Sequence, residues 1–156
     1  MSLKKERSLK MDIVALQNKP TVMSRFEIVS ETVTAELAKP YEYGVADCFM
    51  MGLEVVDAIR GTSHRKAYLG RYSTYPDAHK VLKKDGFKTL ADLLRDKIGL
   101  TEIGFGTATV GDIALVSVGD GRDHVSVFTG GLGFLTKTES GPEKFGTEYV
   151  KICFRV

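Results

Sequence analysis

Cys48 combines residue type and position in a way that could support nucleophilic catalysis. It follows the segment Tyr-x-Tyr-Gly-x-x-Asp at residues 41–47 and opens a run of apolar residues with helical spacing. A cysteine in the first turn of a helix lies near unpaired backbone N–H groups and the positive end of the helix dipole, which favour the thiolate and could bind an oxyanion. The alternative is that Cys48 is a small buried core residue, a common role of free cysteines.

His124 is the second candidate, as a general base. It begins the run 124–129, in which β-branched residues alternate with Ser126 and Phe128, a pattern typical of a strand. A base on a rigid strand that faces a helix N-terminus is the arrangement that thiol–imidazole catalysis requires. The alternative is a histidine at a hairpin edge that hydrogen-bonds to its own turn.

The elements that must position these residues change in kind half-way along the chain. Helical spacing predicts a helix over 21–39, closed by Pro40, and a second helix from Asp47 or Cys48 to Gly61 with Asp47 as its N-cap. Residues 61–75 are predicted to be a loop. The sequence then predicts short helices over 76–84 and 89–98, and strands over 112–118, 124–129, 134–138 and 149–154. This order predicts an α+β fold, with N-terminal helices packed on a small antiparallel β-sheet.

Length and composition are those of a single domain. Residues 1–19 are predicted to be a flexible N-terminal lead-in, and residues 20–156 one domain. The formal charge of +2 comes from 22 basic and 20 acidic residues, too even a balance to indicate a nucleic-acid or membrane partner. Two cysteines and three scattered histidines predict neither a metal site nor a disulfide framework, and no cofactor motif is present. The start of the chain does not resemble a signal peptide, which favours a cytoplasmic protein.

Two segments together resemble a known family. YEYGVADCF at 41–49, followed by GDIALVSVGDGRDHVSVFTGG at 111–131, is similar to the paired signature of the NlpC-type papain-like cysteine peptidases and amidases. The order and spacing of the two segments make the resemblance specific, and it covers about residues 38–135. A phage- and prophage-associated branch is the most similar, because it shares the short Gly-x-x-Asp-Cys loop and a segment like Gly70-Arg71-Tyr72.

The resemblance implies a papain-like fold and assigns roles to individual residues. Cys48 would be the nucleophile and His124 the general base, which later protonates the leaving amine. Tyr41 would help to bind the oxyanion, and Asp47 would cap the helix that carries the nucleophile. The implied reaction is hydrolysis of an amide in a peptide or a peptidoglycan fragment, plausibly in a stem peptide. Phage structural proteins are the implied partners, and a virion-associated location would fit them.

The sequence also departs from the family pattern. Phe49-Met50 replaces the usual Ser-Gly after the cysteine, which gives a more apolar wall. Residues 61–105 form an insertion that could shape or cover the cleft. The third polar residue of the family has no clear match. By position it should be Thr136, with Thr138 and Glu139 as alternatives.

Other interpretations stay open at this stage. The scaffold could be a catalytically weak or inactive module for binding or assembly in a phage or prophage particle. The same Cys–His pair could transfer acyl groups on lipid-like substrates, which would predict an apolar cleft. Tyrosines 68, 72 and 75 could line a substrate groove or pack as a local cluster. Cys153 is predicted to be a core strand residue, and His64 and His79 surface residues.

Overall fold

The structure is a computed structural model that describes residues 22–131 and 133–156. The lead-in expected over residues 1–19 lies outside this range. The helices come first in the chain: α2 (Arg25–Leu37), α3 (Cys48–Arg60), α4 (His64–Tyr68), α5 (Tyr75–Lys84), α6 (Leu90–Asp92) and the π-helical turn η1 (Leu93–Lys97). The strands are β1 (Thr101–Ile103), β2 (Ile113–Val116), β3 (His124–Phe128), β4 (Phe134–Thr138), β5 (Gly141–Phe145) and β6 (Val150–Arg155). Two 3-10 turns, η2 (Phe105–Thr107) and η3 (Thr147–Tyr149), complete the order.

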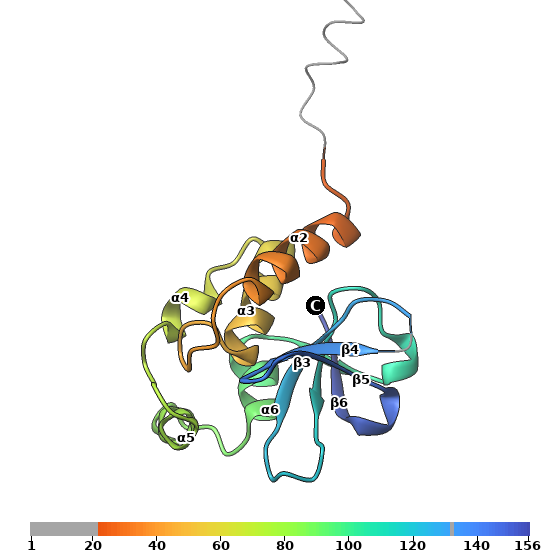
Figure 1. Ribbon diagram of the computed structural model, residues 1–156. Helices are drawn as coiled ribbons and strands as arrows, with labels where there is room; N and C mark the ends of the chain where they lie inside the picture. Colours follow the sequence, from red (N-terminus) through yellow and green to blue (C-terminus); the bar gives the residue numbers. More distant parts are fainter. Residues whose placement is uncertain (1–21, 132) are drawn as a thin grey trace, which may run out of the picture.

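The six strands form one antiparallel sheet in the order β1-β6-β2-β3-β4-β5. Figure 1 shows the helices gathered on one side of the molecule and the sheet on the other, and α3 packs against both α2 and β3. The predicted α+β class, with N-terminal helices packed on an antiparallel sheet, is therefore confirmed.

Two apolar clusters cover the two faces of the sheet. The larger lies between the sheet and the helices, where Val125 and Val127 of β3 meet residues of α3 such as Met51 and Val55. The smaller lies on the opposite face and includes Cys153, which is 2% exposed and confirms its prediction as a core strand residue. Because side chains alternate between faces along a strand, each central strand contributes to both clusters.

Helix α3 begins and ends as predicted. The Asp47 side chain caps the helix by accepting from the Met50 backbone N–H, and Gly61 ends it in the left-handed conformation with φ of 69°. Gly52 brings the helix close to the sheet, because a Cβ atom there would lie 2.6 Å from Cγ1 of Val125. Val125 is the residue after His124, so this close contact fixes the first turn of α3 relative to the start of β3.

Helix α2 is shorter than predicted and has a narrower apolar face. The helix begins at Arg25, because the Ser24 side chain accepts from the Glu27 backbone N–H and caps it there. Val29 and Val33 are buried, but Phe26, which shares their helical spacing, is 61% exposed. Phe26 lies in the first turn, outside the contact with the core.

Several elements differ from the sequence prediction. The predicted loop 61–75 contains the short helix α4, whose first turn is held by the Asp57 carboxylate through the His64 and Arg65 backbone N–H groups. The edge strands β1 and β5 were not predicted. Strand β5 carries Pro142 and is mostly exposed, which is how proline is tolerated at a sheet edge. Within residues 22–131 and 133–156, no helix combines the length and apolar character needed to cross a membrane.

Candidate active site

The loop before Cys48 is a tight turn organised by the Asp47 carboxylate. Besides capping α3 through Met50, this buried side chain accepts from the Gly44 backbone N–H at 2.8 Å and from the Tyr72 hydroxyl at 2.6 Å. Gly44 has φ of 79°, a conformation that favours glycine. The predicted capping role of Asp47 is therefore confirmed, and the same carboxylate also joins the loop to a distant segment.

That distant segment is Gly70-Arg71-Tyr72. The Gly70 backbone N–H donates to the Gly44 carbonyl at 2.9 Å, and Tyr72 reaches Asp47. Arg71 points to the other side, where its two terminal nitrogens each lie 2.8 Å from one oxygen of Asp85. This fork geometry is typical of a specific arginine–carboxylate pair. The segment therefore fastens the region 61–105 to the loop that carries the nucleophile candidate.

Cys48 is the first residue of α3 and is partly exposed. Burial raises the pKa of its thiol from the ordinary value of 9.0, and the adjacent Asp47 carboxylate adds to the effect, giving a pKa of about 12. The Val125 backbone, the Thr136 hydroxyl and the Phe49 backbone act in the opposite direction. Burial and the Asp47 charge therefore oppose the effect expected of the helix N-terminus, and a raised pKa favours the neutral thiol at neutral pH.

His124 begins β3 and hydrogen-bonds to its own turn, as the alternative interpretation of this residue predicted, although its partner Asp120 was not singled out. Its Nε2 atom lies 2.8 Å from Oδ2 of Asp120, in the hairpin between β2 and β3. The hydrogen bond with His124 lowers the pKa of Asp120, which is therefore ionised at neutral pH and can only accept. Nε2 must then carry the proton, and the neutral imidazole keeps its lone pair on Nδ1.

Thr136 does not have the role expected of it. It is fully buried on β4, and its hydroxyl lies 2.6 Å from the Val125 carbonyl, to which it donates. Its effect on the pKa of Cys48 places it beside the thiol rather than behind the imidazole. The alternatives fail as well, since the Thr138 hydroxyl donates to the Gly141 carbonyl and Glu139 accepts from the Tyr43 hydroxyl. Asp120 is the group that orients His124.

The strand geometry explains why Thr136 lies there. Strands β3 and β4 pair at Val127–Leu135 and Phe128–Phe134, and the pairing does not extend to the residues before Val127. The Val125 carbonyl therefore has no backbone partner in the β3–β4 register, and it accepts a hydrogen bond from the Thr136 hydroxyl instead. Cys48 lies at this point, where the two strands separate.

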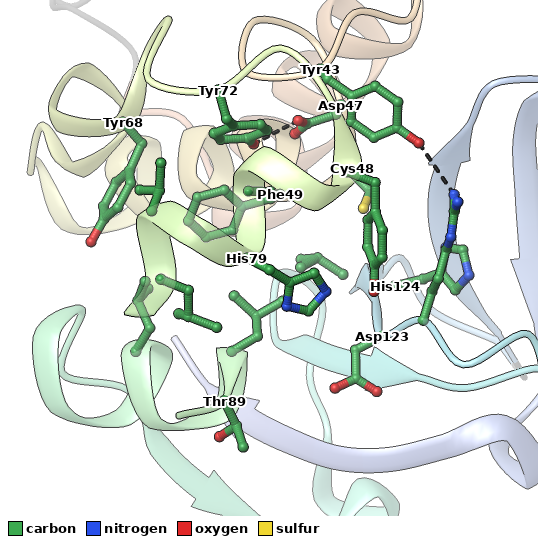
Figure 2. A pocket seen from close by; sticks show the side chains of 18 of the residues that line it. Tyr43, Asp47, Cys48, Phe49, Tyr68, Tyr72, His79, Thr89, Asp123 and His124 are labelled. Atoms are coloured by element: carbon green, nitrogen blue, oxygen red, sulfur yellow. Dashed lines mark hydrogen bonds between the residues drawn. The ribbon is translucent and has the colours of Figure 1, made fainter. Parts of the chain in front are cut away.

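Cys48 and His124 line one cavity of about 340 Å³. Figure 2 shows the two residues at the same end of the cavity, with Phe49 and then Tyr68 progressively farther from the sulfur atom. Tyr41 also lines it, and burial together with the nearby Cys48 raises the pKa of its hydroxyl, so Tyr41 stays a hydrogen-bond donor. The structure therefore brings together four of the five predicted site residues around one space: Cys48, His124, Tyr41 and Asp47.

The remaining wall comes largely from region 61–105, which was expected to shape the cleft. Residues between Tyr68 and Leu93 line the cavity. The three tyrosines of the insertion, residues 68, 72 and 75, all contribute. His79 is exposed, which confirms its prediction as a surface residue; it also lines the cavity and packs edge-on against Tyr75, with ring centroids 4.7 Å apart.

Comparison with known proteins places the chain in a family. Residues 23–156 match the family model described as Domain of unknown function (DUF6950). The chain belongs to this family. The DUF6950 match takes in both α3 and the β2–β3 hairpin, so it includes every residue assigned above to the candidate site. A search of curated proteins and a search of solved structures gave no match.

Proposed function

We propose that this DUF6950 protein is a cysteine hydrolase that cleaves an amide or related acyl bond, with Cys48 as nucleophile and His124 as general base. The observation that carries the proposal is that a cysteine at the start of a helix and a histidine oriented by Asp120 line the same cavity. A nucleophile, a base and a group that orients the base are the three parts that such catalysis needs.

The proposed reaction begins with a neutral thiol. As the Cys48 sulfur attacks the substrate carbonyl, Nδ1 of His124 takes the thiol proton, and Asp120 stabilises the resulting imidazolium. The tetrahedral oxyanion is stabilised by the Tyr41 hydroxyl and by first-turn backbone N–H groups of α3 that have no intrahelical acceptor. The imidazolium then protonates the leaving nitrogen as the C–N bond breaks, which leaves a thioester on Cys48. A water molecule, deprotonated by His124, hydrolyses this thioester and restores the thiol.

The resemblance to the NlpC-type enzymes supplies a substrate and a setting for the proposal. It favours a papain-like fold, which is consistent with a cysteine at a helix start facing a histidine at a strand start. It also favours an amide in a peptidoglycan stem peptide as the substrate, and a phage or prophage particle as the place of action. These assignments rest on analogy, because one fold can support many activities.

Intact-protein mass spectrometry with an activated ester, p-nitrophenyl acetate, tests the proposal. We expect one acetyl group to accumulate on the protein and to be lost again by hydrolysis. Cys48→Ala should abolish the adduct, and His124→Ala should slow its formation at least about 100-fold, as expected for loss of a general base.

Matched variants control for nonspecific labelling. Cys153→Ala removes the other thiol, which is buried in the smaller cluster and has a pKa raised to about 11. His64→Ala removes a histidine that does not line the cavity. Both variants should acylate like the parent protein. Acylation that survives Cys48→Ala, or that is indifferent to His124→Ala, would overturn the proposed mechanism.

The high pKa of Cys48 favours a second candidate, a binding or assembly module without catalysis. A thiol with a pKa of about 12 is a poor nucleophile unless a base removes its proton during attack. On this alternative no ester or peptide acylates the protein, and ligand binding in the cavity is unchanged by His124→Ala. The acylation experiment therefore separates the two candidates.

A further inference from the structure

The interior of the cavity beside Cys48 is apolar. Away from the sulfur its wall is formed by Phe49 of α3, Tyr68 of α4, Val81 and Leu82 of α5, and Leu93 after α6. Tyr68, Leu82 and Leu93 are at most 8% exposed, so these side chains are part of the core as well as of the wall. Apolar side chains dominate ligand pockets, where a few polar groups fix the orientation of the ligand.

The basic residues of the cavity lie at its mouth, and the acidic ones already have partners: the buried Asp47 accepts from Gly44, Met50 and Tyr72, and Asp123 from Lys151. Lys88, Arg122 and Lys151 contribute to its lining, but all three are exposed. Arg122 is held there by its neighbours, with its guanidinium 4.3 Å from the centroid of the Tyr75 ring and one nitrogen 3.4 Å from the Tyr43 hydroxyl. A ligand that reaches the interior therefore meets mostly apolar and aromatic surface, in which the buried Tyr68 hydroxyl, without a hydrogen-bond partner among the described residues, is a polar point.

We infer that the occupant of this cavity is an apolar group, and that the substrate is a carbonyl compound whose acyl part carries an alkyl chain or an aromatic ring. The inference rests on the proposed function for the reaction, but the apolar wall is independent of it. A volume of about 340 Å³ is at the small end of ligand pockets, which span roughly 300–1,000 Å³, and suits one medium-length chain or ring. Two sources could supply such a group: a fatty acyl ester or thioester, and a peptide with a large apolar side chain.

The first arm of the test measures kcat/KM for p-nitrophenyl acetate, butyrate, hexanoate, octanoate and decanoate. If the chain enters the apolar interior, kcat/KM should rise about three- to fourfold per added methylene until the cavity is full. A parallel arm compares glycyl, leucyl and phenylalanyl p-nitroanilides, which present the apolar group as a peptide side chain. The faster series identifies the source.

Blocking variants locate the effect. Val81→Phe and Leu90→Phe add bulk at two different positions of the wall, and each should flatten the chain-length dependence, measured as the ratio of kcat/KM for octanoate to kcat/KM for acetate within the same variant. Leu69→Phe makes the same kind of change at a residue that is 48% exposed and outside the cavity, and should keep the parent profile. Two blocking variants are used so that, if one of them fails to fold, the other still tests whether the alkyl chain enters the cavity.

A binding measurement separates failure of this inference from failure of the proposed function. In the Cys48→Ala variant, decanoate should displace the fluorescent probe 1-anilinonaphthalene-8-sulfonate, and Val81→Phe should weaken this displacement about tenfold or more. Binding without any turnover by the parent protein would overturn the proposed hydrolysis and keep the apolar occupant. Equal rates for acetate and octanoate with no decanoate binding would overturn the inference and keep the hydrolase. Cleavage of a peptidoglycan stem peptide with no apolar preference would also overturn the inference and keep the hydrolase.

Discussion

Oδ2 of Asp120 lies 2.8 Å from Nε2 of His124, four residues farther along the same hairpin. Asp120 lies in the β2–β3 connection and His124 begins β3, so the base and the group that orients it are fixed by local structure. Asp120 does not line the cavity, whereas His124 does. The carboxylate therefore contacts the imidazole on the side away from the cavity, where a bound ligand does not touch the carboxylate.

Removing this carboxylate should impair the chemical step more than substrate binding. For Asp120→Ala we expect kcat to fall about 10- to 100-fold with KM within about twofold, because the imidazole loses its preferred orientation and tautomer. Asp120→Asn should recover part of the loss, since the amide oxygen can still accept from Nε2. Steady-state kinetics on p-nitrophenyl acetate measures both constants. Asp77→Ala, which removes an exposed aspartate of α5, is the control, and a rise in KM alone would contradict a positioning role.

The raised pKa of Cys48 predicts a particular pH dependence of alkylation. In a Cys153→Ala background, the rate constant for iodoacetamide should rise with pH without reaching a plateau up to about pH 10.5, since a pKa of about 12 keeps the thiolate fraction small and increasing. An unperturbed thiol would level off above its ordinary pKa of about 9. A plateau below about pH 8 would instead show an ion pair in the resting protein and contradict the neutral thiol.

The same shift predicts that folding weakens in alkali. The thiol of the unfolded chain ionises from about pH 9, whereas the folded thiol stays neutral up to about pH 12, so stability is lost as the pH rises between these values. At pH 10 the loss from Cys48 should be about 1 kcal/mol relative to pH 7. Urea unfolding at both pH values measures it, and Cys48→Ala should show a correspondingly smaller difference. An equal difference in both proteins would assign the effect to other groups.

Asp47 both stabilises the loop and disfavours the thiolate, so its removal should have opposite effects on stability and reactivity. We expect Asp47→Asn to lower the free energy of unfolding by about 1–2 kcal/mol through weakened contacts to Gly44 and Tyr72. Loss of the negative charge should lower the pKa of Cys48 and accelerate its alkylation several-fold at a given pH.

A second aspartate of α3 provides the control for this prediction. The Asp57 carboxylate also holds a loop, by accepting from the His64 and Arg65 backbone N–H groups, but it is not among the groups that shift the pKa of Cys48. Asp57→Asn should therefore cost stability without changing alkylation. If both variants accelerate alkylation equally, general loosening of the fold rather than charge is the cause.

Gly44 is required for contact between the Cys48 loop and the insertion. A Cβ atom there would lie 2.0 Å from the Tyr72 carbonyl oxygen, and φ of 79° adds strain. We expect Gly44→Ala to lower the free energy of unfolding by about 2–4 kcal/mol and to reduce acylation of Cys48. Gly86→Ala, where φ is 88° but the Cβ direction is open, should cost only about 1 kcal/mol and leave acylation unchanged. Thermal or urea unfolding distinguishes the two, and equal costs would show that backbone strain alone is responsible.

Local signals predicted the helical half of the site well. The residue types at positions 47 and 61 predicted both ends of α3, because an N-cap aspartate and a C-terminal glycine act through contacts only a few residues away. The strands β2, β3, β4 and β6 were also predicted, because their β-branched and aromatic runs bury apolar surface. The same pattern predicted that strand β3 begins at His124.

Long-range contacts set the rest, and the sequence could not show them. Nothing in the run from Gly119 to Asp123 separates the aspartate that binds His124 from one that only makes a turn, although its position four residues before the histidine was the available signal. Thr136 was assigned by its position on the next strand, but β4 pairs with β3 only from Val127 onward, and the Thr136 hydroxyl meets the Val125 carbonyl and Cys48 instead of His124. The cavity wall from α5 and α6 likewise depends on tertiary packing rather than on local sequence.

The hydrogen bond from Tyr72 to the buried Asp47 makes the wall and the nucleophile parts of one cooperative unit. If the segment Gly70-Arg71-Tyr72 moved away, Asp47 would still cap α3 through Met50, but its buried carboxylate would lose the hydrogen bond from Tyr72. Amide hydrogens of this segment should therefore exchange with deuterium at rates close to those at the start of α3, rather than at the faster rates of a detached flap. A ligand would then enter through the mouth around Arg122, and a shortened chain lacking the insertion would lose the nucleophile loop along with its cover.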